Sequence, residues 1–169
     1  MKKRLSYSIW AGFSNQDVKE LNKIKRKFNF FKGPKFILHL TISSIKHSNK
    51  KKILQLLNLN QKNLNKFNIN ILNCEISDKF FESIYLKVKK NNEIKSFKKK
   101  IDNIFKIKKN KFSPHISLYY GLKTKEQKRK IINKLKNYKN KILLVNKIYL
   151  AINDEDNLRW KIVRKYNLY

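Results

Sequence analysis

The chain has 169 residues, and 41% of them are hydrophobic, which is enough for one well-filled core. Lysine and arginine outnumber the acidic residues by 42 to 11, so the formal net charge is +31. The single cysteine, Cys74, excludes an intrachain disulfide and a cysteine-rich zinc site, and no stretch approaches the roughly 20 apolar residues of a membrane span.

The basic residues 2–4 run directly into an alternating, strand-like segment rather than an apolar one, so we expect no signal peptide and a cytoplasmic protein. Apolar alternation predicts strands over residues 5–13, 36–42, 69–76, 80–88, 112–120, 142–152 and 158–169. Helical spacing behind capping residues predicts helices over residues 14–28, 47–64, 93–105 and 124–135. The order βαβαββαβαββ indicates the α+β class, with two similar halves.

Two short motifs, residues 39–42 (HLTI) and 115–118 (HISL), each place a histidine two residues before a hydroxyl inside an apolar run. The four polar residues are His39, Thr41, His115 and Ser117. On a strand, positions i and i+2 face the same side, so Leu40 and Ile116 would turn into the core. Two such strands side by side would form a near-symmetric site for metal-free acid/base chemistry on a phosphate.

Each motif must be weighed against an ordinary structural role. A lone histidine in an apolar strand is more often a structural residue, but two matched motifs in corresponding halves favour a functional site. The third histidine, His47, lies at a predicted helix start, and we interpret it as a surface or capping residue.

Four further segments carry a recognisable pattern beside the two motifs: residues 7–10 (YSIW), 33–36 (GPKF), 80–86 (FFESIYL) and 113–121 (SPHISLYYG). With them, nearly the whole chain resembles the two-histidine (2H) phosphoesterase superfamily, and within it the cyclic phosphodiesterase branch. Leu38 departs from the pattern, because relatives often have proline there. The resemblance implies one domain over residues 1–169: a bilobal α+β fold, with two antiparallel sheets facing a central cleft and helices on the outer faces.

The resemblance also implies roles for the motif residues. His115 would activate a water molecule, and His39 would protonate the departing ribose oxygen. Thr41 and Ser117 would hydrogen-bond the phosphoryl oxygens as their charge changes. Neither motif supplies the clustered carboxylates and histidines that a catalytic metal needs, so we expect no metal and no cofactor.

Three aromatic residues, Tyr120, Trp10 and Phe81, are expected by resemblance to bind the substrate, as walls or stacking surfaces for a base or ribose. The opposing interpretation is that aromatic side chains in strands mostly belong to the core.

The resemblance implies metal-independent hydrolysis of a nucleoside 2′,3′-cyclic phosphate, or of ADP-ribose 1″,2″-cyclic phosphate, to a phosphomonoester. A second hypothesis is a 2H enzyme that acts on RNA ends, on 2′,5′-oligoadenylate or on a cyclic oligonucleotide signal. A third is a non-catalytic, basic RNA-binding protein. The charge fits RNA binding through a basic surface, but A/T-rich codons alone would also raise the lysine content. We expect a monomer with no membrane association.

Overall fold

The computed structural model describes residues 6–45, 49–108, 110–133, 138–154 and 159–169. The strands are β1 (Ser6–Phe13), β2 (Leu40–Ile45), β3 (Phe67–Ile76), β4 (Ile84–Val88), β5 (His115–Tyr119), β6 (Ile142–Asp154) and β7 (Arg159–Asn167). The helices are α1 (Asn15–Arg26), α2 (Lys50–Asn60), α3 (Asn92–Ile104) and α4 (Lys125–Ile132), with short 3-10 helices η1 (Gln61–Asn63) and η2 (Phe80–Glu82). This order of strands and longer helices is the one that the sequence predicts.

Side-chain caps begin the helices where the sequence indicates. The hydroxyl of Ser14 accepts a hydrogen bond from the backbone N–H of Asp17 at 3.1 Å, which satisfies one of the free donors at the start of α1. Thr124 and Gln127 form a reciprocal capping box at the start of α4. Asn49 and Asn91 cap α2 and α3 in the same way as Ser14 caps α1.

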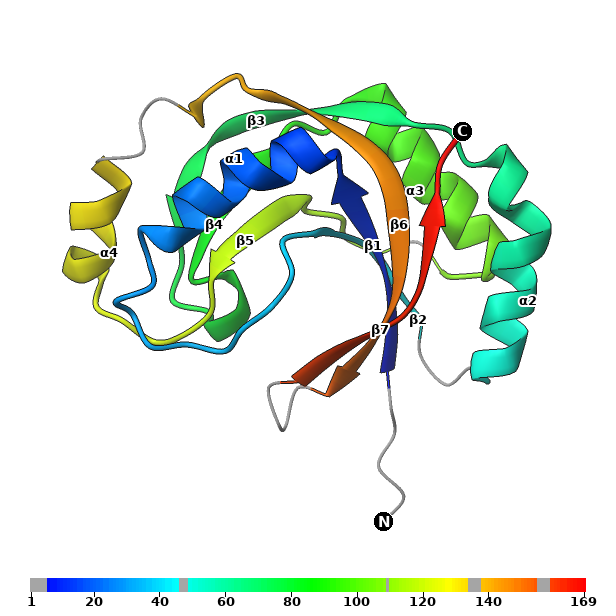
Figure 1. The fold of residues 1–169 in the computed structure, drawn as a ribbon, viewed down its shortest axis with the longest axis horizontal. Helices are drawn as coiled ribbons and strands as arrows, with labels where there is room; N and C mark the ends of the chain where they lie inside the picture. Colours follow the sequence, from blue (N-terminus) through cyan, green and yellow to red (C-terminus); the bar gives the residue numbers. More distant parts are fainter. Residues whose placement is uncertain (1–5, 46–48, 109, 134–137, 155–158) are drawn as a thin grey trace, which may run out of the picture.

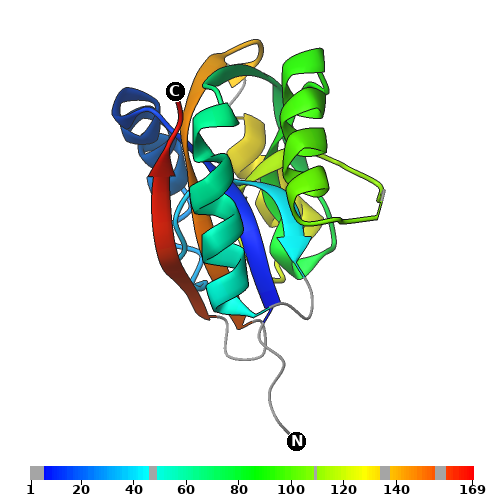
Figure 2. The same cartoon turned by 90° about the vertical axis from the view of Figure 1, so that its right-hand side faces the viewer.

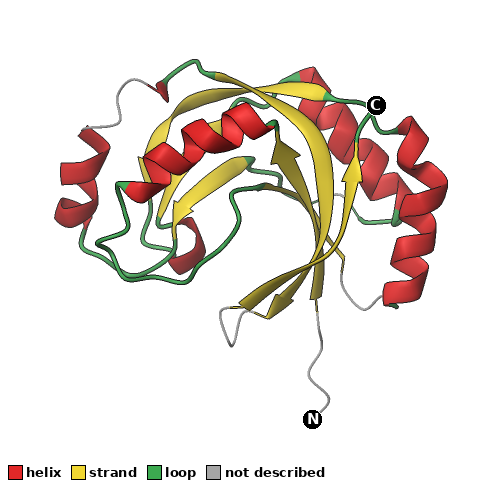
Figure 3. Ribbon diagram, viewed as in Figure 1, coloured by secondary structure: helices red, strands yellow, loops and turns green. Residues whose placement is uncertain are grey.

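All seven strands belong to one antiparallel sheet, in the order β1-β2-β5-β4-β3-β6-β7. Strand β1 also pairs with β6, so six strands close into a ring and β7 lies outside it on β6. Strand β6 has 13 residues, and it pairs with β3 near its beginning and with β1 over the rest of its length. Figures 1 and 3 show the resulting strongly curved sheet.

The expectation of two separate sheets, one in each lobe, is not confirmed. Strand β6 is too long to belong to one half, and β2 pairs with β5 across the boundary between the halves. The internal similarity of the halves is nevertheless visible in the order β1-β2-β5-β4, because the two motif strands are central and each is flanked by the preceding strand of its own half.

The helices pack on this curved sheet. Helix α3 covers β2 and β3, and α2 lies beside α3, as Figures 1 and 2 show. Helix α1 contacts β5, and α4 contacts β3. Within the described part of the chain, no helix is long and apolar enough to cross a membrane.

Three predicted strands begin later than expected. Residues 36–39 precede β2, residues 80–82 form η2 instead of the start of β4, and residues 112–114 precede β5. In a sheet, the backbone carbonyls of these segments would accept hydrogen bonds from a neighbouring strand. Here side chains donate instead to the carbonyls of Phe36, Ile37, Phe81 and Ser113. His47 and three ends of predicted elements, at residues 5, 135 and 158, lie outside the described residues.

Candidate active site

The two motif strands lie side by side, as the sequence predicts. Leu40 of β2 and Ile116 of β5 are direct cross-strand partners, and both are fully buried in the core. Side chains alternate along a strand, so His39, Thr41, His115 and Ser117 face the opposite side. We call the surface made by these four residues the histidine face.

Both imidazoles are oriented by a backbone carbonyl two residues earlier in the chain. Nδ1 of His39 lies 2.6 Å from the carbonyl oxygen of Ile37, and Nδ1 of His115 lies 2.9 Å from that of Ser113. A carbonyl oxygen can only accept, so each Nδ1 must carry the hydrogen. Nε2 is therefore the atom that each neutral imidazole has left for accepting a proton.

An aromatic ring lies against each histidine. Trp10, the cross-strand partner of Thr41, stacks on His39 with ring centroids 3.6 Å apart. Tyr85, the cross-strand partner of Ser117, meets His115 edge-on at 5.4 Å. The two halves thus use the same arrangement, in which the aromatic residue opposite the motif hydroxyl supports the motif histidine.

The two histidines differ in burial. His39 is 7% exposed, whereas His115 is half-buried. Burial lowers the pKa of His39 to about 4, against a smaller upward effect of the Ile37 carbonyl, and the charges of His115 and Lys25 lower it further. At neutral pH and without a bound anion, His39 is therefore uncharged.

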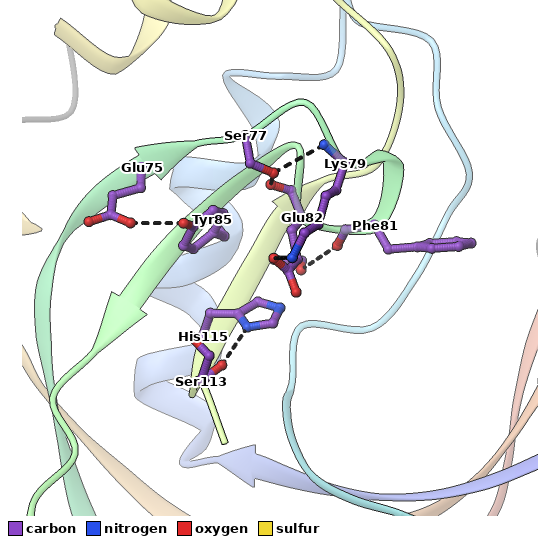
Figure 4. A network of polar contacts seen from close by, with 9 residues as sticks. Glu75, Ser77, Lys79, Phe81, Glu82, Tyr85, Ser113 and His115 are labelled. Carbon is purple, nitrogen blue, oxygen red and sulfur yellow. Dashed lines mark hydrogen bonds and ion pairs between the residues drawn. The ribbon is translucent and has the colours of Figure 1, made fainter. Parts of the chain in front are cut away.

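The hydroxyl of Ser117 is held by the segment that precedes β4. Its Oγ donates to the carbonyl oxygen of Phe81 at 3.0 Å. Figure 4 shows this bond beside His115, with Phe81 on the η2 turn. The turn is itself fixed by Ser77, which donates to the carbonyl of Glu82 at 2.8 Å.

Next to the histidine face lies a group of four aromatic side chains, which we call the aromatic cluster: Phe36, Phe81, Tyr120 and Trp160. Tyr120 stacks on Phe36 at 3.9 Å, and its ring lies 5.5 Å from Phe81 and 5.4 Å from Trp160. The bond from Ser117 to Phe81 connects the cluster to the histidine face.

Lys25 of α1 contacts the aromatic cluster through Phe36. Its Nζ sits 3.6 Å from the ring centroid of Phe36 and donates to the carbonyl oxygen of the same residue. Burial lowers its pKa to about 8. Its effect on the pKa of His39 indicates that a cationic group stands within electrostatic reach of the imidazole.

Residues 11–167 match the model of one protein family, described as cyclic phosphodiesterase-like protein. The chain belongs to this family of 2H phosphoesterases. The match covers both histidine motifs. No curated protein matches the chain in sequence.

Solved structures share the fold of this family member. Escherichia coli LigT in its apo form is similar over 99% of both chains, with a TM-score of 0.64 and 11% identity. LigT complexed with 3′-AMP gives a TM-score of 0.62 at 11% identity, over 98% of this chain and 99% of that one. The protein TT0787 of Thermus thermophilus gives a TM-score of 0.59 at 12% identity, over 96% of this chain and 97% of that one.

The residues predicted for the site fall into two adjoining groups. Trp10 joins the four motif residues, whereas Tyr120 and Phe81 lie in the aromatic cluster. Sequence reasoning missed Lys25, Phe36, Tyr85 and Trp160, because only the tertiary pairings bring them to the site. Among the described residues, no three His, Cys, Asp or Glu side chains are grouped closely enough to hold a metal ion.

Proposed function

We propose that this 2H phosphoesterase hydrolyses a cyclic phosphodiester to a phosphomonoester by paired histidine acid/base catalysis, without a metal. The substrate is a nucleoside 2′,3′-cyclic phosphate or ADP-ribose 1″,2″-cyclic phosphate. The observation that carries the proposal is the matched geometry of the histidines: His39 directly precedes β2, His115 begins the neighbouring strand β5, and each has its Nδ1–H bonded to a carbonyl oxygen. That arrangement leaves the Nε2 atom of each ring for proton transfer. The cytoplasm, where a lone cysteine stays reduced, is the proposed location.

In the proposed reaction, His115 acts as the base and His39 as the acid. Nε2 of His115 takes a proton from water while the water oxygen forms a bond to phosphorus. The bond between phosphorus and one ribose oxygen breaks, and Nε2 of His39 gives its proton to that oxygen. His115 ends protonated and His39 neutral, so exchange with solvent restores both.

His39 must be protonated before it can act as an acid, although its pKa is about 4 without a ligand. The bound phosphodiester supplies the negative charge that raises this pKa, since a nearby opposite charge favours the charged form. The Ile37 carbonyl and the face of Trp10 also stabilise an imidazolium. His39 therefore becomes protonated when the substrate binds.

The hydroxyls of Thr41 and Ser117 complete the proposed site by donating to the non-bridging phosphoryl oxygens. Ser117 donates to the Phe81 carbonyl in the unliganded protein, so its hydroxyl must rotate when phosphate binds. Tyr120 and Phe81 provide ring surfaces for the base or ribose, and Phe36 and Trp160 extend those surfaces.

A substrate panel in EDTA tests this function. It contains the four nucleoside 2′,3′-cyclic phosphates and ADP-ribose 1″,2″-cyclic phosphate, and the position of the product phosphate is read by NMR. We expect turnover of at least one of them, with phosphate retained on the 2′ oxygen of a nucleoside product. Turnover that requires added metal would contradict the mechanism, and binding of these compounds without any hydrolysis would favour a non-catalytic protein.

A further inference from the structure

Three polar side chains lie beside the second motif, on the next two strands of the sheet. Lys87 on β4 is the cross-strand partner of His115, and Tyr85 is the partner of Ser117. Glu75 on β3 is in turn the partner of Tyr85. Cross-strand partners point to the same side of a sheet, so Glu75, Tyr85 and Lys87 lie on the same side as the two motif residues.

The carboxylate of Glu75 holds the other two side chains. The hydroxyl of Tyr85 donates to Oε2 of Glu75 at 2.8 Å, and Nζ of Lys87 donates to Oε1 at 2.9 Å. Figure 4 shows the first of these bonds together with the imidazole of His115. Each carboxylate oxygen has its own donor, so the hydroxyl end of Tyr85 is fixed by a residue that is not one of the four motif residues.

The protonation states of Glu75 and Tyr85 argue against a proton-transfer role for the tyrosine. Burial works to raise the pKa of Glu75, but hydrogen bonds from Lys87 and Tyr85 lower it below its ordinary value, so the carboxylate is ionised at neutral pH. Burial and the bond to Glu75 raise the pKa of Tyr85 to about 12. The phenol therefore keeps its proton, and any contribution that it makes to the reaction comes from its position.

The two motif histidines need different supports. Trp10 is 3% exposed and stacks on His39 with 11° between the ring planes, so packing alone holds both rings. Tyr85 is only half-buried, and it meets His115 with 66° between the planes. An edge contact at a half-buried position leaves a tyrosine free to change rotamer unless its hydroxyl is held, and Glu75 holds it.

We propose that Tyr85 is a positioning residue for His115 and that Glu75 fixes Tyr85 in the orientation this requires. The inference deepens the proposed function and rests on it for the role of His115 as the base. The ring of Tyr85 keeps the imidazole turned so that Nδ1–H meets the carbonyl oxygen of Ser113 and Nε2 stays free to take the proton from water. Such restraint matters because a displacement of about 1 Å can lower a rate by about 10²-fold.

Four variants separate the contacts. Tyr85→Phe removes the hydroxyl and keeps the ring, and Glu75→Ala removes the acceptor. Glu75→Gln loses the charge but keeps an oxygen that can accept from the phenol. Lys87→Gln removes the ion pair and leaves the bond between Glu75 and Tyr85 in place.

Two matched controls make the same changes elsewhere. Tyr166→Phe removes a buried hydroxyl that has no hydrogen-bond partner in the part of the chain that the structure describes. Glu20→Ala removes a carboxylate that pairs with Lys23 on α1. Neither residue belongs to the histidine face or to the aromatic cluster, so both controls should leave kcat and KM unchanged.

We expect Tyr85→Phe and Glu75→Ala each to lower kcat for the best substrate on the order of tenfold, with KM unchanged. The double variant Tyr85→Phe/Glu75→Ala should be no slower than either single variant, because both changes remove the same bond. Glu75→Gln should restore the wild-type kcat, and Lys87→Gln should retain it. If the three side chains only joined β3 to β4, the variants would lower the free energy of unfolding and leave kcat unchanged.

Nitrogen NMR of His115 gives a measurement that does not depend on turnover. At a pH well above the ordinary pKa of imidazole, the wild-type protein should show one tautomer, with the hydrogen on Nδ1. Tyr85→Phe and Glu75→Ala should show a mixture of the two tautomers, because the ring is no longer held against the Ser113 carbonyl. Glu75→Gln and Tyr166→Phe should show the wild-type tautomer.

The results separate this inference from the proposed function. Hydrolysis with a wild-type kcat in Tyr85→Phe would overturn the positioning role and leave the function intact. Mixed tautomers in Tyr85→Phe, with no substrate hydrolysed by the wild-type protein, would confirm that Tyr85 orients His115 and overturn the function. A loss of kcat in Lys87→Gln as large as in Glu75→Ala would overturn the role of Tyr85, since the ion pair would then carry the effect.

Discussion

At the scale of single residues, the carbonyl oxygens of Ile37 and Ser113 determine which nitrogen of each histidine takes part in proton transfer. The sequence predicts the pair of histidines and hydroxyls because a strand fixes the relation between positions i and i+2. It does not predict Tyr85 or Trp10 as ring partners of particular histidines, because those contacts depend on the register between strands.

The pH dependence of stability follows from the burial of His39. Its pKa is about 4 in the folded protein and near 6.5 when exposed, so the unfolded chain binds a proton that the folded protein does not. His39 should therefore destabilise the fold as the pH falls from about 6.5 to 4, by about 3 kcal/mol at most, and should have no such effect above pH 7.

Urea unfolding of wild type and His39→Gln over this pH range measures that effect. As the pH falls from about 6.5 to 4, the free energy of unfolding of the wild type should decrease relative to that of His39→Gln. The variant His115→Gln keeps His39 and should show the same decrease. A difference independent of pH would show that His39 is not buried as described.

At the scale of elements, a buried ion pair anchors α3 to the strand of the first motif. Nζ of Lys98 lies 2.9 Å from Oδ2 of Asp102 and 3.2 Å from the hydroxyl of Ser43 on β2. Ser43 also donates to Asp102 at 2.6 Å. The sequence predicts α3 from its apolar spacing, but not this polar contact, which joins residues far apart in the chain.

Removing the carboxylate should leave a buried ammonium without its partner. Asp102→Ala is expected to lower the free energy of unfolding by about 3–5 kcal/mol. Glu126→Ala is the matched control, because Glu126 and Lys130 have the same spacing on α4 but are exposed; it should change stability by less than about 0.5 kcal/mol. Similar effects of the two variants in urea unfolding would contradict this role of the Lys98 pair.

A glycine ends the strand of the second motif. Gly121 has φ +146°, and a Cβ there would lie 2.3 Å from the hydroxyl oxygen of Tyr119. Gly121→Ala should therefore cost about 1–3 kcal/mol in backbone strain and displace Tyr120 from the aromatic cluster. The free energy of unfolding measures the backbone strain, and the KM for the best substrate measures the displacement of Tyr120. Leu122→Ala, at an exposed neighbouring position, is the control and should change neither quantity. An unchanged KM in Gly121→Ala would show that the glycine has no part in substrate binding.

At the scale of the whole molecule, the sequence predicts the order of the elements and the α+β class, because caps and periodicity are local signals. It does not predict the single closed sheet. Closure of the sheet depends on β6, which pairs with β3 at one end and with β1 at the other. No local sequence signal distinguishes such a long strand with two partners from a strand that belongs to one lobe. The surface cavities beside residues 27–36 have the same origin, since this segment meets α4 and β7 only in the folded chain.

The net charge of +31 should attract anionic substrates to the molecule. We expect kcat/KM for a nucleoside cyclic phosphate to fall as salt rises, because screening weakens the attraction before binding. The rate at saturating substrate, kcat, should change little and serves as the internal control. A value of kcat/KM independent of salt would indicate that the charge has no part in substrate capture.

The central claim is that His39 and His115 transfer the protons. Its most direct test is the turnover of the best substrate from the panel, in EDTA, by His39→Ala and His115→Ala, with His47→Ala as the matched control. Each of the first two changes should lower kcat by about 10²–10⁴ while circular dichroism shows a folded protein, and the third should leave kcat unchanged. Near-normal turnover by either motif variant would contradict the account.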